Sequence, residues 1–387
     1  MDNFVFHTPT KIFFGKGMID NLPEEIIAVG KKVLLAYGGG SIKKIGLYDK
    51  IVSLFKENNI EFFELSGIEP NPKIESVREG VKICRDNNIE AIVAVGGGST
   101  IDCCKAISAT VFYDGDPWEV VMDWSKIGRV LPIFDVLTLS ATGTEMNGNA
   151  VISNMELNDK KALIDESLKP VCSILDPEYT LTVSKYQTAS GTADIMSHIF
   201  EAYFSKTTGA TVQDNISEAL LKICFKYGKK AIDNPDDYDA RANLMWASSL
   251  AINGLNNCGK GGEWSCHSME HQLSAYYDVT HGAGLAVLTP AWFEYILSDD
   301  TVDKFVDYGV NVLEIDKTLD KFEIAKLAIS KTKDYFKEMG LPSTLGELGI
   351  DDKNLDIMAQ KAADEGLENA YVPLSKEDVL KIYKACY

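Results

Sequence analysis

Short apolar runs alternate with longer amphipathic stretches in the first part of the chain. We predict strands over 32–37, 61–65, 91–95 and 132–139, which are rich in Val, Ile, Leu, Phe and Ala. Between two of them, Val77, Val81 and Cys84 recur at three- and four-residue spacing, which predicts a helix over 74–87. Strands that alternate with helices are typical of a parallel sheet with crossover connections.

The pattern changes beyond Asp176 and Pro177, where β-rich runs disappear and helical periodicity dominates. We predict helices over 216–227, 241–255, 324–339 and 376–387. The chain has 387 residues, and single cores stop growing at roughly 250–300 residues. The sequence therefore predicts an α/β, Rossmann-like N-terminal domain over 1–180 and an all-α C-terminal domain over 181–387.

The composition is that of an ordinary globular protein, with 45% hydrophobic, 10% aromatic and 25% charged residues. A net charge of −19 repels phosphate backbones and anionic lipids, so we expect no nucleic-acid or membrane partner. The start of the chain has neither a basic nor an apolar targeting region, and we expect a cytoplasmic protein. The eight cysteines form no C-x-x-C pair, which predicts reduced thiols, including a buried, inert Cys266.

Two Gly-Gly-Gly-Ser segments each follow a predicted strand directly. The first contains Gly38, Gly39, Gly40 and Ser41, and the second contains Gly96, Gly97, Gly98 and Ser99. Glycine lets a backbone approach a pyrophosphate, and the helix that follows offers unpaired N–H groups and the positive end of its dipole. We predict that the second segment binds the pyrophosphate of a dinucleotide. Neither segment is the G-x-G-x-x-G fingerprint, and a tight turn without a ligand is the alternative.

The first segment bears on the choice of cofactor. NAD-binding sites place an acid near the end of the second strand to hold the ribose 2′-hydroxyl, and no acid follows this strand. The segment and the adjacent Lys43 and Lys44 offer N–H groups, a hydroxyl and positive charge, which suit a 2′-phosphate. We therefore favour NADP(H), with NAD(H) possible, although the two lysines could also be a solvated helix start.

Histidines are scarce and clustered. Of the five, His198, His267, His271 and His281 lie in the predicted helical half, and we assign no role to His7. Asp194 and His198 are four residues apart, as are His267 and His271, so a helix would bring each pair to one face. A single histidine is usually a core or surface residue. Several imidazoles with one carboxylate suit Zn²⁺ or Fe²⁺, and we predict one catalytic ion.

The chain closely resembles the iron-containing alcohol dehydrogenases and, within them, the butanol dehydrogenase type. The resemblance rests on motifs at 9–17, 69–72, 96–102, 139–145, 175–177, 194–198, 266–271 and 280–282. It implies a dehydroquinate synthase-like two-domain fold. It also implies hydride transfer between NADP(H) or NAD(H) and a small primary alcohol or aldehyde, such as butanol or butyraldehyde. We expect a homodimer.

The resemblance further implies the roles of individual residues. Iron or zinc would be held by Asp194, His198, His267 and His281, with His271 unligated nearby as the catalytic proton carrier. The dinucleotide channel would be lined by Asn71, Gly97, Gly98, Ser99, Thr138, Thr142, Asn147 and Lys160, and the adenosine end would be held by Gly38, Gly39, Gly40 and Ser41.

Other functions fit the same plan, because a fold does not fix a function. The first alternative is a glycerol- or diol-type dehydrogenase, or a lyase, on the same fold. A lyase with a phosphorylated substrate should show a dense basic cluster, and the predicted helical half shows no obvious one. The second alternative is a non-catalytic metal or nucleotide sensor, which would need the same residues.

Overall fold

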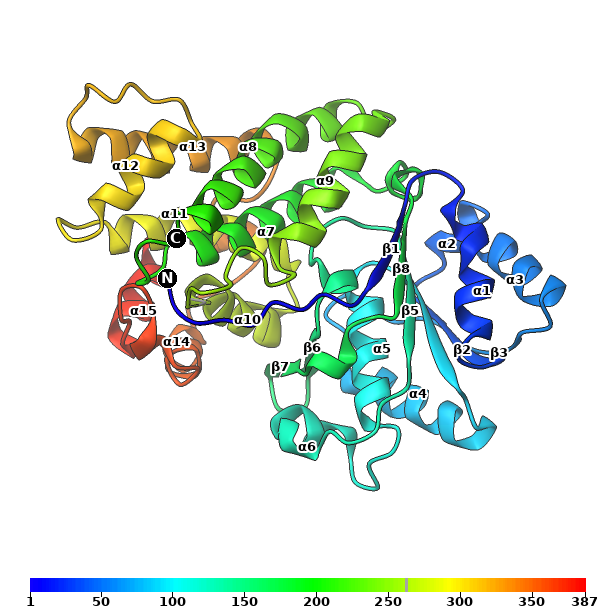
Figure 1. The fold of residues 1–387 in the computed structure, drawn as a ribbon. Helices are drawn as coiled ribbons and strands as arrows, with labels where there is room; N and C mark the ends of the chain where they lie inside the picture. The colour runs from blue at the N-terminus through cyan, green and yellow to red at the C-terminus, as the bar shows by residue number, and fades with distance from the viewer. Residues whose placement is uncertain (262–263) are drawn as a thin grey trace. The chain divides into compact units, whose positions relative to one another are not determined.

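The computed structural model describes residues 1–261 and 264–387, and the chain forms two compact units. The sheet unit contains residues 7–183 and 236–249. The helical unit contains residues 1–6, 184–235 and 250–387. The fold class predicted from the sequence, an α/β unit and a helical unit, is confirmed (Figure 1). The units differ from the predicted domains, because residues 1–6 and 236–249 each group with the other half of the chain.

The sheet unit is built on a six-stranded parallel sheet with the order β1-β8-β5-β4-β2-β3. The strands are β1 (Lys11–Phe14), β2 (Lys32–Tyr37), β3 (Glu61–Leu65), β4 (Ala91–Gly96), β5 (Ile133–Leu137) and β8 (Cys172–Leu175). The predictions for β2 and β3 match to the residue. The predicted strand over 132–139 is shorter in the structure.

Helices cover both faces of this sheet (Figure 1). They are α1 (Leu22–Ile27), α2 (Ser41–Lys44), α3 (Leu47–Glu57), α4 (Ile74–Asn87) and α5 (Gly98–Thr110), while α6 (Pro117–Met122) packs on α4, α5 and β7. Successive residues of a strand point to opposite faces, so Leu34 and Ala36 of β2 pack with α4 and α5, while Val33 and Leu35 pack with α1 and α3. Burial on both faces explains why β2 reads as a continuous apolar run.

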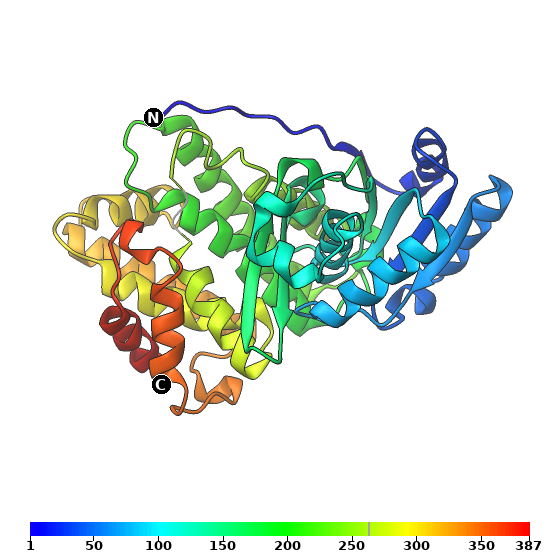
Figure 2. The same ribbon diagram turned by 90° about the horizontal axis from the view of Figure 1, so that it is seen from below.

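A second, two-stranded sheet was not predicted from the sequence. The strands β6 (Asn149–Asn154) and β7 (Asp159–Ile164) pair antiparallel and form a hairpin (Figure 2). Its signal was present as a β-branched pair, Val151 and Ile152, followed by an asparagine-rich turn. Asn158 in that turn adopts a left-handed backbone with φ 46°, a conformation that asparagine tolerates better than most residues.

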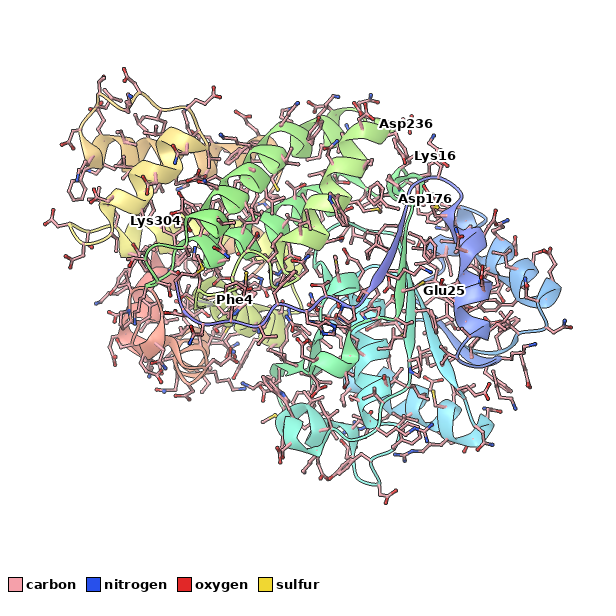
Figure 3. All side chains as sticks on the ribbon, viewed as in Figure 1. Phe4, Lys16, Glu25, Asp176, Asp236 and Lys304 are labelled. Atoms are coloured by element: carbon pink, nitrogen blue, oxygen red, sulfur yellow. The ribbon has the colours of Figure 1, made fainter. Side chains whose placement is uncertain are left out.

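Asp176, at the predicted change of pattern, holds the turn that follows β1. Its Oδ2 accepts a hydrogen bond from the Gly17 backbone N–H at 2.9 Å, and its Oδ1 accepts one from the Glu178 N–H at 3.0 Å. Lys16 forms an ion pair with Glu178 at 2.7 Å, and Figure 3 shows Lys16 and Asp176 at this turn. One carboxylate therefore ties together the loops that follow β1 and β8.

The described residues beyond β8 contain helices and no strands, as predicted. The helices are α7 (Lys185–Tyr203), α8 (Thr211–Asp233), α9 (Tyr238–Ala251), α10 (Ser265–Tyr277), α11 (His281–Ile296), α12 (Val302–Asn311), α13 (Lys321–Glu338), α14 (Leu355–Ala363) and α15 (Lys376–Ala385). Phe204 lies at the centre of an aromatic core, with ring contacts to Phe293, Phe305 and Tyr308. None of the described helices is both long enough and apolar enough to cross a membrane.

Candidate active site

Helix α7 carries the first two predicted ligands. The helix begins after Ser184, whose side chain accepts a hydrogen bond from the Gln187 N–H and so caps one of the free N–H groups of the first turn. Asp194 and His198 lie one turn apart in the middle of the helix, and their side chains are 3% and 6% exposed. An ionised carboxylate in such a dry position needs partners.

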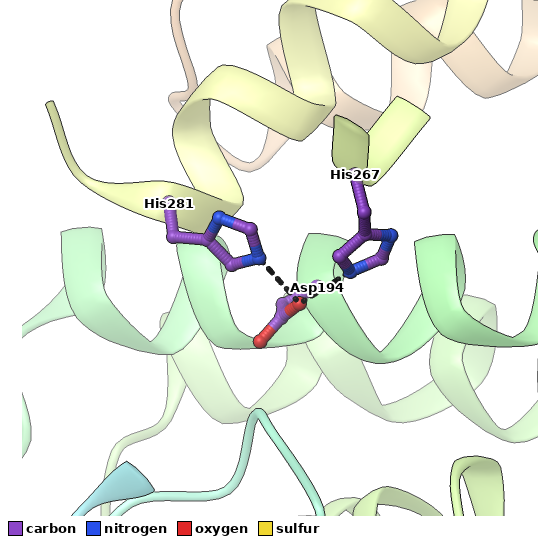
Figure 4. Close-up of side chains that lie close together, drawn as sticks. All are labelled: Asp194, His267 and His281. Carbon is purple, nitrogen blue, oxygen red and sulfur yellow. Dashed lines mark ion pairs between the residues drawn. The ribbon is translucent and has the colours of Figure 1, made fainter. Parts of the chain in front are cut away.

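Helices α10 and α11 supply His267 and His281. The N-terminal end of α11 approaches α7 so closely that a Cβ atom at Gly282 would lie 1.9 Å from the Ser190 carbonyl oxygen. Only glycine fits at this position. The close contact fixes the first residue of α11, His281, over α7, with its ring turned towards Asp194 (Figure 4).

Three imidazoles converge on one carboxylate oxygen. The Nε2 atoms of His198, His267 and His281 lie 3.5, 3.7 and 3.6 Å from Asp194 Oδ1, and Figure 4 shows the last two contacts. Ligands bound to one tetrahedral Zn²⁺ at about 2.0–2.2 Å would lie about 3.3–3.6 Å apart. Asp194 Oδ1 and His267 Nε2 are buried and have no hydrogen-bond partner among the described residues. The ligand atoms of Asp194, His267 and His281 lie within 4.8 Å of one another, so their donor set and spacing fit one divalent ion, and His198 adds a nitrogen beside Asp194 Oδ1.

Buried carboxylates stand behind two of these imidazoles. Glu201 of α7 contacts Nδ1 of His267, and Glu270 of α10 contacts Nδ1 of His281. Glu201 also accepts the Cys266 backbone N–H at 2.5 Å. A carboxylate on the far nitrogen fixes the tautomer and orientation of a histidine, which leaves Nε2 as the donor towards an ion.

Burial and neighbouring charges set the protonation of the cluster. Burial raises the pKa of Asp194, but the surrounding imidazoles outweigh it and lower the pKa below its ordinary value. Burial lowers the pKa of His198 to about 3. Burial also lowers the pKa of His267, but Glu201 and Asp194 together raise it to about 9. Asp194 is thus ionised and His198 neutral at pH 7, the forms that bind a cation, whereas His267, with a pKa of about 9, has to lose a proton when a cation binds.

His271 lies one turn beyond His267 on α10, at the edge of the cluster. Its ring centroid is 6.2 Å from that of His267 and 5.7 Å from that of His281. His271 is half-buried, and the His281 side chain is 22% exposed, whereas the other predicted ligands are buried. Solvent therefore reaches the cluster from the side of His271 and His281.

The second glycine segment joins β4 to α5, as predicted. Gly97 precedes the first turn of α5, and Gly98 packs directly against Thr142, where a Cβ atom would lie 2.4 Å from Thr142 Oγ1. The Thr138 N–H donates to the Gly96 carbonyl oxygen at 2.9 Å. The structure thus brings together Gly97, Gly98, Ser99, Thr138 and Thr142.

The first glycine segment joins β2 to α2. No heavy atom lies within 4 Å of a Cβ atom placed on Gly39, so this position is open. Lys43 Nζ lies over the rings of Tyr37 and Tyr48, at 4.9 and 4.5 Å from their centroids. Glu64 of β3 accepts hydrogen bonds from both tyrosine hydroxyls, at 2.5 and 2.7 Å. Glu64 therefore lies beside Tyr37, the residue that precedes Gly38. The sequence alone did not connect this acid with the first glycine segment.

The remaining predicted channel residues form two further groups. Lys160 Nζ of β7 lies 3.1 Å from Asn71 Oδ1, and both side chains are buried. Asn147 Nδ2 donates to the Gly143 carbonyl oxygen at 3.0 Å. Asn71 has a left-handed backbone with φ 48°. Few residue types other than glycine and asparagine adopt this conformation readily, so the loop restricts which residue can stand here.

Sequence reasoning missed both supporting glutamates. Glu201 lies three residues after His198 and seven after Asp194, which places all three on one face of α7. Glu270 lies three residues after His267 in α10. This helical spacing was a usable signal. Acidic residues are too common in this chain, at 57 Asp and Glu, for their presence alone to have drawn attention.

The chain is similar to known proteins along nearly its whole length. Residues 9–177 match the family model for iron-containing alcohol dehydrogenase, and residues 188–387 match the model for the C-terminal part of the Fe-containing alcohol dehydrogenase family. The chain is 58% identical to NADH-dependent butanol dehydrogenase A of Clostridium acetobutylicum, over 100% of both chains. It is 38% identical to the NADPH-dependent aldehyde reductase YqhD of Escherichia coli, over 95% of this chain and 94% of the relative.

A solved structure shows the same fold. The crystal structure of NADH-dependent butanol dehydrogenase A from Thermotoga maritima is similar with a TM-score of 0.95 and 40% sequence identity. The similarity covers 100% of this chain and 99% of that chain.

We predict that Glu201→Gln weakens the binding of a divalent ion by about 10- to 100-fold, because the amide no longer orients His267 as a carboxylate does. Competition with a chromogenic chelator would measure the affinity for Zn²⁺. Glu218→Gln is the matched control, since Glu218 accepts a hydrogen bond from Tyr203 at 2.8 Å in the same unit. Equal affinities for the Glu201 variant and the wild type would remove this role from Glu201.

Proposed function

The chain belongs to the iron-containing alcohol dehydrogenase family, and we propose that it interconverts small primary alcohols and aldehydes, such as butanol and butyraldehyde. Its relatives are named as NADH- or NADPH-dependent enzymes, and the chain is accordingly an NAD(P)-dependent oxidoreductase. One observation carries the proposal for the site, namely the three imidazole nitrogens at 3.5–3.7 Å from Asp194 Oδ1. A bound divalent ion would account for the convergence of these nitrogens on one carboxylate oxygen.

We propose that Asp194, His198, His267 and His281 hold Fe²⁺ or Zn²⁺. When bound, the ion supplies Lewis acidity to the substrate oxygen, and the nicotinamide supplies or accepts the hydride. The protein contributes position, because the buried glutamates fix the rings of His267 and His281.

The proton of the alcohol hydroxyl needs a separate route, and we propose His271 for it. This half-buried imidazole lies on the side of the cluster that solvent reaches. A ring nitrogen of His271 would accept the proton during alcohol oxidation and return it during aldehyde reduction, directly or through water.

The sheet unit would bind the dinucleotide. We propose that Gly97, Gly98 and Ser99 contact the pyrophosphate, that Asn71, Thr138, Thr142, Asn147 and Lys160 line the channel, and that Gly38, Gly39, Gly40 and Ser41 hold the adenosine end. The open space at Gly39 supports NADP(H) as the preferred cofactor, because a 2′-phosphate needs room. Relatives that are 58% and 56% identical are named NADH-dependent, and one that is 38% identical is named NADPH-dependent, so both cofactors are tested.

We also propose a cytoplasmic homodimer. All eight cysteines are free, as is usual in a reducing compartment. Strand β1 lies at the edge of the sheet, bonded to β8, and its Ile12, Phe13 and Phe14 are half-buried. Edge strands with apolar side chains pair readily with another chain. Light scattering on the purified protein would show whether its molar mass is twice that of the 42.6 kDa chain.

The central experiment is an assay of metal-stripped protein reconstituted separately with Fe²⁺ and Zn²⁺. Oxidation of NADPH and NADH would be followed with a series of linear aldehydes, and cofactor reduction with butanol, glycerol and 1,2-diols. We expect metal-dependent turnover of the simple aldehydes and alcohols. Full activity with less than about 0.1 equivalent of metal would refute the metal role, and a clear preference for glycerol would favour the diol-type alternative.

A substitution at Gly39 tests the cofactor preference. We predict that Gly39→Asp disfavours NADP(H) relative to NAD(H) by at least about 10-fold in kcat/KM, because a carboxylate repels the 2′-phosphate and accepts a hydrogen bond from the ribose. The position has room for a side chain, so the fold should be kept. Gly39→Asn has nearly the same size without the charge. The same shift in both variants, or none in the aspartate variant, would contradict the assignment.

Alanine substitutions separate the ligands from the proton carrier. We predict that His267→Ala loses bound metal and turnover together, with at least a 10- to 100-fold loss of metal affinity. His271→Ala should keep about one equivalent of metal while kcat falls roughly 10²- to 10⁴-fold. Metal analysis and alcohol oxidation rates would be measured on both variants, with His7→Ala as the control. Metal loss from His271→Ala but not from His267→Ala would reverse the two roles.

A further inference from the structure

Helix α5 carries a fully buried lysine whose ammonium takes no part in the chemistry proposed above. Lys105 lies two turns beyond Gly98, the first residue of the helix, and its side chain has no exposed surface. Burying an ammonium without partners lowers the free energy of unfolding by roughly several kcal/mol. The groups that accept hydrogen bonds from the Lys105 ammonium therefore indicate the role of this residue.

All the hydrogen-bond partners of Lys105 lie on one short segment, residues 144–149, between β5 and β6. The Nζ atom lies 2.6 Å from the Thr144 carbonyl oxygen, 2.7 Å from Thr144 Oγ1, 2.7 Å from the Asn147 carbonyl oxygen, 3.1 Å from Asn147 Oδ1 and 2.9 Å from the Asn149 carbonyl oxygen. Because an ammonium has three N–H donors, these five oxygens share them. The segment is wrapped around a single cation.

Acidic side chains lie near this charge, and burial raises the pKa of Asp102, Asp135 and Glu145 above their ordinary values. Asp102, one turn before Lys105, accepts hydrogen bonds from Thr144 Oγ1 at 2.6 Å and from the Val151 N–H at 2.9 Å. Burial lowers the pKa of Lys105 to about 8, while Asp102, Asp135 and Glu145 act to raise it. Lys105 therefore remains mostly charged at pH 7, when its attraction for backbone carbonyl oxygens is strongest.

The anchored segment continues directly from the residues that we propose to bind the dinucleotide. Thr142 packs against Gly98, and the Thr144 N–H lies 3.4 Å from Thr142 Oγ1. The carboxamide of Asn147 is occupied within the loop, since its oxygen accepts from Lys105 and from the Asn149 N–H at 2.8 Å, and its nitrogen donates to Gly143. Its bonds shape the loop, so Asn147 acts together with Lys105.

We infer that Lys105 is a positioning residue for the dinucleotide site, and that it holds residues 142–149 against the glycine segment at the start of α5. The inference rests on the proposed function, because it assumes that Gly98 and Thr142 face the cofactor. A helix that carries the pyrophosphate-binding turn at its start and the anchor of the opposing loop two turns later fixes both walls with one rigid element. Loss of the anchor should widen the site without disturbing the metal cluster, which lies in the other unit.

The test compares two buried lysines that both lie within the electrostatic influence of an acid. Lys105→Met removes the ammonium and keeps an unbranched side chain that is one atom shorter. Lys260→Met is the matched control, because Lys260 forms a 2.5 Å ion pair with Asp214 in the helical unit and its side chain is 1% exposed. Both variants should lose thermal stability and keep wild-type metal content. Only Lys105→Met should raise the dissociation constants of NADPH and NADH, by at least about 10-fold, measured by fluorescence titration.

A second measurement separates positioning from general loss of stability and needs no cofactor. Amide hydrogen exchange over residues 142–149 should become faster in Lys105→Met and stay at the wild-type rate in Lys260→Met. Thr144→Val, which removes one hydroxyl of the cluster, should give a smaller change in the same direction, and it decides the matter if Lys105→Met does not fold.

The outcomes are distinct. A folded Lys105→Met with unchanged dissociation constants and unchanged exchange overturns the inference, and so does Thr144→Val without an effect if the first variant is lost. Equal loss of cofactor affinity in the Lys260 control also overturns it. A wild type that binds neither NADPH nor NADH refutes the proposed function, and faster exchange in Lys105→Met would then still support the anchoring of the loop.

Discussion

The carboxylate of Asp194, buried among three imidazoles, is the interaction on which the helical unit depends. An ionised carboxylate out of water is strongly unfavourable unless opposing charge and donors surround it. Helices α7, α10 and α11 meet at this point, and the absence of a side chain at Gly282 allows their close approach. The imidazoles converge on Asp194 Oδ1 through Nε2, and Glu201 and Glu270 hold two of the rings from behind. A divalent ion would complete this balance of charge.

The sheet unit solves a related problem with the opposite charge. Lys105 is buried in α5, two turns beyond Gly98, and oxygens of residues 144–149 surround it. In each unit, a buried charge and its partners hold in place the elements that carry the proposed functional groups. This charge is Asp194 in the helical unit and Lys105 in the sheet unit. Removing one partner of such a pair leaves an uncompensated charge, which costs about 3–5 kcal/mol. Stability and positioning are therefore linked in this protein, which is why the Lys105 variant is compared with a variant of another buried lysine.

The sequence predicted the regular part of the fold well, for a physical reason. Strand β2 and helix α4 match their predictions to the residue, because a parallel strand covered on both faces reads as an apolar run and an amphipathic helix as a 3.6-residue period. The hairpin of β6 and β7 was missed, since its residues alternate less clearly and Asn149–Asn154 is rich in polar side chains. The predicted helix over 241–255 ends earlier, as α9 stops at Ala251.

The sequence by itself determined the two-part architecture, the two glycine segments and the histidines, because periodicity and rare residue types are local properties of a chain. Only the tertiary structure decided which oxygen the imidazoles share, and that Glu201 and Glu270 support them. It also decided that Glu64 lies next to Tyr37 and that Lys105 anchors the loop. These residues come from segments far apart in the chain, and acidic and lysine side chains are common. Their roles arise from contacts that helix packing and strand order create, and the helical spacing of Glu201 and Glu270 shows only that they share a helix face with histidines.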